Sequence, residues 1–165
     1  MIAEHLLTHG LFYAIVVTGY LFVTMVTTSP RVWGYNDYSQ AIKDKVPPQT
    51  KSEKRLAMLI AVPWFIFMLG FPIYSTLVLK AKLSGDISVG VAFLNLFTLF
   101  LFLTVGDLLI LDWLIVSKTT PQFVIIPGTL KEDYKDFSHH FKGHAKSLIV
   151  IIPIFLVLAA IISYL

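Results

Sequence analysis

The chain has 165 residues, of which 56% are hydrophobic and 14% are charged, with a formal net charge of +3. Soluble domains are about 45–50% apolar and about 25% charged, and a domain this small has too little interior to hide so much apolar surface. The composition therefore predicts a membrane protein and excludes a soluble enzyme, a disordered chain and a nucleic-acid module. The absence of cysteine excludes disulfides, thiolate metal sites and cysteine nucleophiles.

Four apolar runs are long enough to cross about 30 Å of hydrocarbon, which takes roughly 20 helical residues. Each is predicted to be a helix, because a lone strand in lipid leaves its backbone unpaired. The runs cover residues 6–28, 56–79, 87–116 and 148–165. The expected fold class is all-α: a polytopic membrane protein with four transmembrane helices in one bundle, spanning residues 1–165 as a single domain. Two polar segments, at about 29–55 and 117–147, connect the helices.

The 13 Lys and Arg residues are unevenly distributed among the connections. Six lie between the first and second runs, five between the third and fourth, and only two between the second and third. Since basic residues collect in cytoplasmic loops, both long segments are predicted to be cytoplasmic and both termini to lie outside. The first run lacks a positively charged start and a small-residue cleavage site. It is therefore predicted to be a retained helix and not a cleaved signal peptide.

Local signals refine these helices. Thr50 and Glu53 have the spacing of a capping box, which predicts the start of the second helix. Pro63, Pro72 and Pro153 lie inside predicted spans. Within a bundle such prolines are tolerated, because neighbouring helices bind the carbonyl groups that proline frees.

Several short motifs lie in and beside the polar segments. They are Pro30-Arg31 with Asp37-Tyr38, Val46-Pro47-Pro48, Glu53-Lys54-Arg55, the stretch Asp107–Trp113, and Ile126-Pro127-Gly128-Thr129 followed by Tyr134-Lys135-Asp136 and His140. In these motifs the chain from Pro30 onward resembles a family of small prokaryotic four-span integral membrane proteins with no established activity. The resemblance implies the four-span architecture, in the plasma membrane of a prokaryote, and nothing about chemistry.

A series of polar residues precedes the fourth run: Glu132, Asp136, His140 and His144 follow one another at four-residue intervals. Four residues turn a helix by about 400°, so neighbours in the series share a face. Two histidines at this spacing suit one metal ion, with carboxylates completing the site. The predicted metal ligands are therefore His140, His144 and Asp136, for a divalent metal. The alternative is a solvated charged helix without metal, because lysines and Gly143 interrupt the same stretch.

Asp107 and Asp112 lie within the third apolar run, where ionisable residues are costly and are functional candidates. Five residues turn an α-helix by about 500°, so the two side chains diverge by roughly 140° and cannot face one ligand unless the helix is distorted. They are the catalytic candidates, either one acting as a base beside the histidines. The structural alternative pairs them with Arg31, Arg55 or Lys118, or gives them a hydrogen bond at a helix end. Whether Asp107 is buried in the bundle or lies at its edge stays open.

His5 and His9 are also four residues apart, at the opposite end of the predicted bundle. Within one chain they lie beyond the reach of the cytoplasmic group. Their expected role is an interfacial cap on the first span. Polar residues inside the spans, such as Asn95 and Thr104, are expected to form interhelical hydrogen bonds.

Three functions remain open. The favoured one is a non-catalytic bundle that binds a partner or ligand through its cytoplasmic loops, since loops carry function. The second is a metal-dependent membrane enzyme acting at the cytoplasmic interface on a lipid-like substrate. The third is an oligomeric channel or carrier. The expected partners are the lipid bilayer and a membrane or cytoplasmic protein, with a homo-oligomer left open and nucleic acid not expected; the cofactor candidate is a divalent metal.

Overall fold

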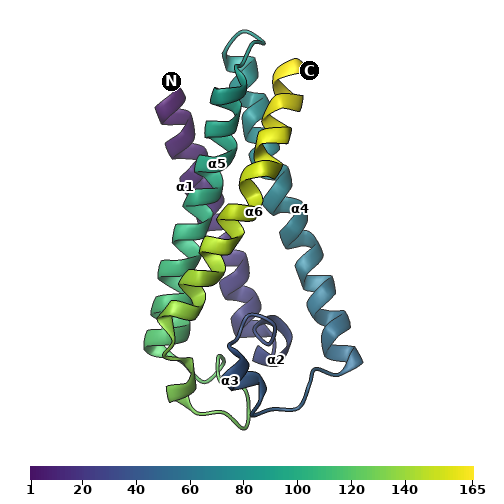
Figure 1. Ribbon diagram of the computed structural model, residues 1–165, viewed down its shortest axis with the longest axis vertical. Coiled ribbons are helices and arrows are strands. Elements are labelled where there is room, and N and C mark those ends of the chain that lie inside the picture. The colour runs from purple at the N-terminus through teal and green to yellow at the C-terminus, as the bar shows by residue number, and fades with distance from the viewer.

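The computed structural model describes residues 1–165 and contains helices but no strands. Its four long helical segments are α1 (Ile2–Thr27), α4 (Lys51–Lys82), α5 (Val89–Gly106) continued by η1 (Asp107–Thr119), and α6 (Phe137–Tyr164) (Figure 1). Four segments are long and apolar enough to cross a membrane. The predicted all-α, four-span fold is confirmed.

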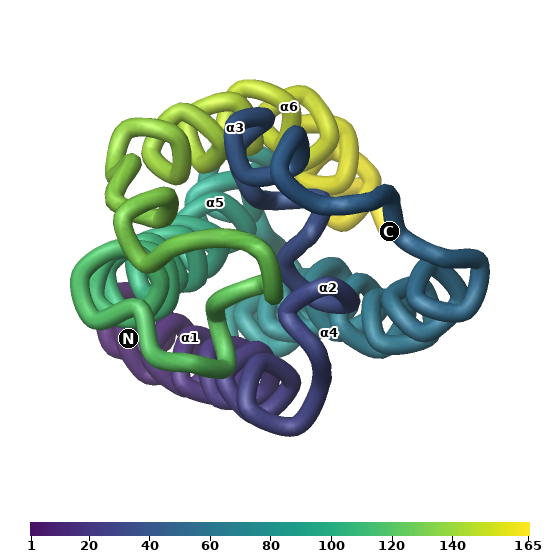
Figure 2. The backbone as a smooth tube through the Cα atoms, turned by 90° about the horizontal axis from the view of Figure 1, so that it is seen from below, coloured from purple at the N-terminus to yellow at the C-terminus, as the bar shows by residue number.

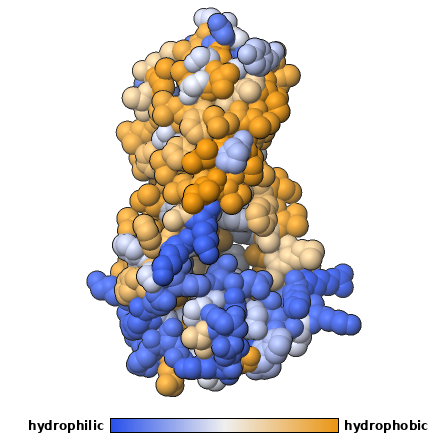
Figure 3. Space-filling view, in the orientation of Figure 1, coloured by the Kyte–Doolittle hydropathy of each residue, from blue (hydrophilic) through white to orange (hydrophobic).

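The two ends of the bundle differ in composition. Both long connections lie at one end, and they contain the short helices α2 (Pro30–Trp33) and α3 (Gln40–Lys43) and the 3₁₀ turn η2 (Lys131–Tyr134). Hydrophilic residues gather at this end, whereas apolar residues cover the long helices (Figure 3). We call it the polar end, and we call the opposite end, where both chain termini lie, the terminal end (Figure 1).

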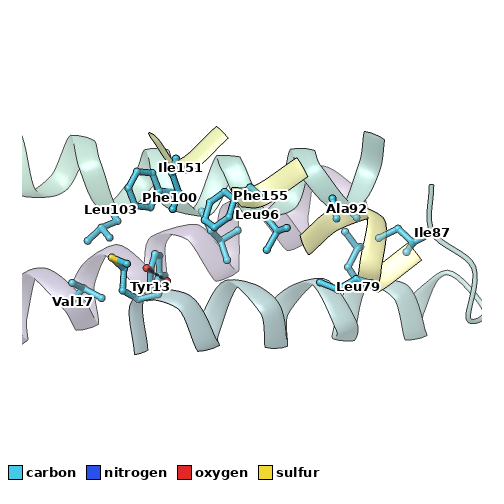
Figure 4. Packing of buried hydrophobic residues seen from close by; sticks show 14 residues of the cluster. Tyr13, Val17, Leu79, Ile87, Ala92, Leu96, Phe100, Leu103, Ile151 and Phe155 are labelled. Atoms are coloured by element: carbon cyan, nitrogen blue, oxygen red, sulfur yellow. Dashed lines mark hydrogen bonds between the residues drawn. The ribbon is translucent and has the colours of Figure 1, made fainter. Parts of the chain in front are cut away.

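The main core is built around α5, which packs against α1, α4 and α6. Leu96 and Phe100 of α5 meet Tyr13 of α1, Leu79 of α4 and Phe155 of α6, all of them buried (Figure 4). Helices α1 and α5 approach closely at Gly10, where an added Cβ would lie 2.5 Å from the ring of Phe102. The core therefore extends along the bundle on both sides of one central helix.

Helix α4 buries residues against the bundle only over its second half, and its first half makes a few contacts, such as the hydrogen bond from the hydroxyl of Tyr20 to the carbonyl of Ile60. Its buried residues all lie between Met68 and Leu79, and toward the polar end the helix leans away from the others (Figure 1). Pro72 cannot donate to the carbonyl of Met68, and the hydroxyl of Tyr13 donates to that oxygen instead, at 2.8 Å. This is the repair by a neighbouring helix that the sequence predicts. Where α4 begins to diverge, a cavity of about 310 Å³ opens against α1, lined by Val16, Val17, Tyr20, Pro63, Trp64 and Phe67.

A second, smaller core closes the polar end. Tyr38 donates to the carbonyl of Val124 at 3.0 Å, and the hydroxyl of Tyr134 accepts from the amide of Ile126 at 2.9 Å. These residues pack with Leu111 of η1, so both connecting segments are fastened to the third long helix. Seen from below, the two segments cross the end of the bundle (Figure 2). They therefore form an ordered cap over the polar ends of the helices.

Two helix boundaries bear on the predictions. Helix α4 begins at Lys51, after the capping box of Thr50 and Glu53 that the sequence predicts, and this detail is confirmed. Helix α6 begins at Phe137, eleven residues before the predicted apolar span (148 minus 137), so its first three turns are polar. The histidines of the second connecting segment therefore lie on the same helix as the fourth span.

Candidate functional site

The helix that carries both aspartates changes its winding at the first of them. From Asp107 to Thr119 the backbone is π-helical, and the amide of Thr120 donates to the carbonyl of Ile115, five residues earlier, at 2.7 Å. A π-helix pairs residues five apart, so it places Asp107 and Asp112 on one face. An undistorted α-helix would have separated them.

Asp136 has a different role from the one predicted. It precedes the first residue of α6, and its Oδ1 accepts from the amide of His139 at 3.1 Å and from the hydroxyl of Ser138 at 2.7 Å. A carboxylate in this position caps the helix, because it satisfies an amide that has no partner within the helix. Glu132 lies in the separate turn η2. Of the four residues in the series, only His140 and His144 share a face of α6.

Those two histidines meet the aspartates of η1. Nε2 of His144 donates to Oδ2 of Asp112 at 2.8 Å and lies 3.9 Å from Oδ2 of Asp107. Nδ1 of His140 lies 3.2 Å from Oδ1 of Asp112. Asp112 thus holds one histidine on each carboxylate oxygen. The four side chains are 10–25% exposed, so the group is shielded from water without being sealed.

No Lys or Arg neutralises these carboxylates. The structure has two ion pairs with a lysine or arginine, Arg31 with Glu53 and Lys45 with Asp133, and neither touches the site. The structural alternative of pairing with Arg31, Arg55 or Lys118 is therefore not what the structure shows. The only ion-pair partners of Asp107 and Asp112 are histidines, which are also metal ligands.

Asp37, between α2 and α3, comes from a distant part of the sequence and lies near enough to Asp112 to be affected by its charge. The residue as a whole is exposed, yet protein atoms crowd its carboxyl. Loss of water around it, and next the charge of Asp112, raise the pKa of Asp37 above its ordinary value. Its backbone carbonyl accepts from Nε2 of His139 at 2.7 Å, which fastens this segment to α6. Asp37 entered the sequence analysis only as part of the Asp37-Tyr38 motif, and nothing there indicated that it would lie beside Asp112.

The geometry of the group suits a cation. One ligand atom each from Asp107, Asp112 and His144 lies within 4.8 Å of the others. Imidazole nitrogen suits Zn²⁺, Fe²⁺ or Ni²⁺, and carboxylate oxygen is compatible with the same ions. His140, on the other oxygen of Asp112, is placed to orient that carboxylate, as outer partners of metal ligands do. The indole of Trp113 donates to the carbonyl of Phe137 at 3.2 Å, which links η1 to the start of α6 beside the site.

Compared with models of known protein families, with curated proteins and with solved structures, the chain finds no match. The resemblance to a prokaryotic four-span family therefore stays a prediction, as does the function. What is known of this site comes from its own residues.

Proposed function

We propose that the chain is a multi-pass membrane protein that binds a divalent transition-metal ion at its polar end. Asp107, Asp112 and His144 are the ligands, and His140 orients Asp112. The observation that carries the proposal is the convergence of three ligand atoms within 4.8 Å, with only histidines as ion-pair partners of the two carboxylates. A divalent ion would balance the negative charge of the two aspartates.

A bound ion would account for two carboxylates lying so close together. Like charges at short range repel more strongly where water is scarce, and desolvation adds to the cost. A cation between them converts this repulsion into attraction. The π-helical winding of η1, which brings the carboxylates to one face, would also gain stability from binding. Ligation would therefore support the local geometry that creates the site.

The cavity next to His140, which Asp107, Asp112 and His144 do not line, is too small for a large substrate. The cavity that reaches His139 and His140 from α3 and η2 has a volume of about 10 Å³, which is room for one water molecule. A lipid-like substrate of a membrane enzyme needs a far larger space next to its catalytic groups. We therefore place ligand binding first and keep the metal-dependent enzyme as the second candidate.

The orientation is part of the proposal. Eleven of the 13 Lys and Arg residues belong to the two connecting segments, which the structure places together at the polar end. The excess of basic residues in cytoplasmic loops would then put the metal site on the cytoplasmic side, and the resemblance to a prokaryotic family implies that the membrane is the plasma membrane of a prokaryote. The ion would be drawn from the cytoplasm.

Zinc binding to the full-length protein in detergent tests the proposal. After treatment with a chelator, calorimetric titration should give about one Zn²⁺ per chain for the wild type, and little or no binding for His144→Gln. Asp136→Asn is the matched control, since asparagine also caps helices and should leave zinc binding unchanged. A wild type that binds no zinc, or a His144→Gln variant that binds it equally well, would refute the metal site.

A further inference from the structure

A second group of polar side chains is buried at the terminal end of the bundle. His5 and His9 of α1 meet Ser75 of α4 and Asn95 of α5, and His5, Ser75 and Asn95 are 0–3% exposed. Asn95 lies 12 residues before Asp107 on the same continuous helix, or ~18 Å at the rise of an α-helix. This group is thus separate from the metal site. It also differs from the interfacial cap that the sequence predicts, because α1 already starts at Ile2 and turns His5 inward.

The hydrogen-bond partners of His5 match a neutral imidazole. Nε2 lies 3.1 Å from the carbonyl oxygen of Ser75, which can only accept, so Nε2 carries a proton. Nδ1 lies 3.4 Å from the ammonium nitrogen of Lys82, which can only donate, so Nδ1 carries none. His5 is therefore a neutral imidazole, held between a donor at one end of α4 and an acceptor further along it.

The hydroxyl of Ser75 also restricts the protonation of His9. Its oxygen faces Nε2 of His5 at 3.0 Å and the amide nitrogen of Asn95 at 3.2 Å, and both groups donate. A hydroxyl oxygen accepts two hydrogen bonds, so its own proton is left for Nδ1 of His9, at 2.9 Å. His9 is then also neutral. Lys82, His5, Ser75 and His9 form one chain in which each group donates to the next.

No acidic group is placed to stabilise a charge here. The charged groups at this end are Glu4 on α1, Lys80 and Lys82 on α4, Asp86 in the α4–α5 connection and the chain termini. Neither histidine has a carboxylate within 4.0 Å, while Lys80 is bonded to the carbonyls of Ile162 and Ser163 at the end of α6. The centres of the two imidazole rings are 3.8 Å apart. A proton added to either ring would therefore place a cation beside a second imidazole and near Lys82.

We propose that His5 and His9 form a proton-binding site, and that filling it separates α1 from α4 at the terminal end. A proton on Nδ1 of His9 makes that nitrogen a donor toward the Ser75 hydroxyl oxygen, which already accepts from Asn95 and shares the single Nε2–H of His5 with the Ser75 carbonyl oxygen. A proton on Nδ1 of His5 sets that ring against the ammonium of Lys82. In both cases the buried charge is relieved when the helices part and water enters, which is how histidine clusters switch interfaces.

Spin-label distances test the switch directly. The chain contains no cysteine, so Ala3→Cys and Ala81→Cys, both at exposed positions of α1 and α4, give a clean label pair at this end. In nanodiscs, the distance distribution should be narrow at about pH 8 and become longer and broader as pH falls through the range in which histidine titrates. With His5→Gln and His9→Gln in the same chain, the distribution should no longer respond to pH.

Lys82→Met separates a titrating site from a merely structural one. Removal of the nearby cation makes protonation of His5 easier, so the midpoint of the distance change should move up by about one pH unit. Lys82 is exposed, so this variant retains the packing of the core. A wild-type distance that does not depend on pH, a response that survives the double glutamine variant, or a midpoint that ignores Lys82→Met would each overturn the proposal.

Discussion

The two ends of this bundle use histidine in opposite electrostatic settings. At the polar end, His140 and His144 face Asp112 and Asp107, and no lysine or arginine is in contact. At the terminal end, His5 contacts Lys82 and Ser75 but no carboxylate. Both pairs have the same four-residue spacing on one helix, so spacing alone does not determine chemistry. The partner helices decide it: η1 supplies acid, whereas α4 supplies a cation and a hydroxyl.

The ends also differ in how tightly α4 is held. At the terminal end α4 contributes buried residues from Met68 to Leu79, and at the polar end it contributes none. The metal site at the polar end is therefore held by η1, α6 and the connecting segments. The histidine pair at the terminal end depends on the contact between α1 and α4. This difference predicts which substitutions affect ligand binding and which affect stability.

The largest effect is expected at Asp112. Asp112→Asn removes the charge that holds both histidines, and it should lower zinc affinity by about a hundredfold or more in calorimetric titration. A control change at the other end, Asn95→Ala, removes a polar group that is remote from the site and should leave zinc affinity unchanged. Equal zinc affinity for Asp112→Asn and wild type would mean that the aspartate only links η1 to α6.

A smaller effect is expected where α4 is packed. Tyr13→Phe leaves the carbonyl of Met68 without a donor inside the bundle, and should lower the free energy of unfolding by about 1–3 kcal/mol. Pro72→Ala restores an amide donor for that carbonyl. In a chain that already carries Pro72→Ala, Tyr13→Phe should therefore lower the free energy of unfolding much less. Unfolding of the wild type, the two single variants and the double variant in detergent measures this coupling. Purely additive changes in the free energy of unfolding would contradict it.

The smallest effects are expected at two glycines, with opposite signs. Gly143 lies between the two histidines of α6, and an added Cβ there meets nothing within 4 Å. Gly143→Ala should therefore raise the free energy of unfolding by about 0.5–1 kcal/mol and leave zinc affinity unchanged. Gly10→Ala should destabilise, because its Cβ would press on Phe102. The unfolding midpoints of the two variants should therefore shift in opposite directions. A shift in the same direction would contradict the difference in packing between the two ends.

The sequence was sufficient for the architecture, because lipid leaves helices as the only way to pair the backbone of each apolar run. The sequence was less informative about where a helix begins when its first turns are polar and its later turns are apolar. Helix α6 starts at Phe137, since a helix capped by Asp136 continues through polar residues that hydropathy does not count. The sequence did contain a signal for this helix start, because aspartate is one of the residues preferred immediately before the first turn of a helix.

The site itself could be anticipated only in part. The four-residue spacing of His140 and His144 and the unusual position of Asp107 and Asp112 were visible in the sequence. Their meeting was not, because it depends on π-helical winding and on the docking of α6 against η1. Asp37 could not be assigned at all, since its place beside Asp112 follows from the packing of the cap. Tertiary contacts of this kind leave no local pattern.

The π-helical winding of η1 makes the number of residues between the aspartates matter more than their identity. Four residues, Leu108–Leu111, separate Asp107 from Asp112, which is one more than an α-helix would need to bring two side chains to the same face. Loss of one of these four residues would allow ordinary α-helical winding with both carboxylates still facing α6. Gain of one would turn Asp112 away from Asp107 in either winding. Across divergent sequences, this stretch is therefore expected to tolerate exchange of its apolar residues and a single deletion, but not an insertion.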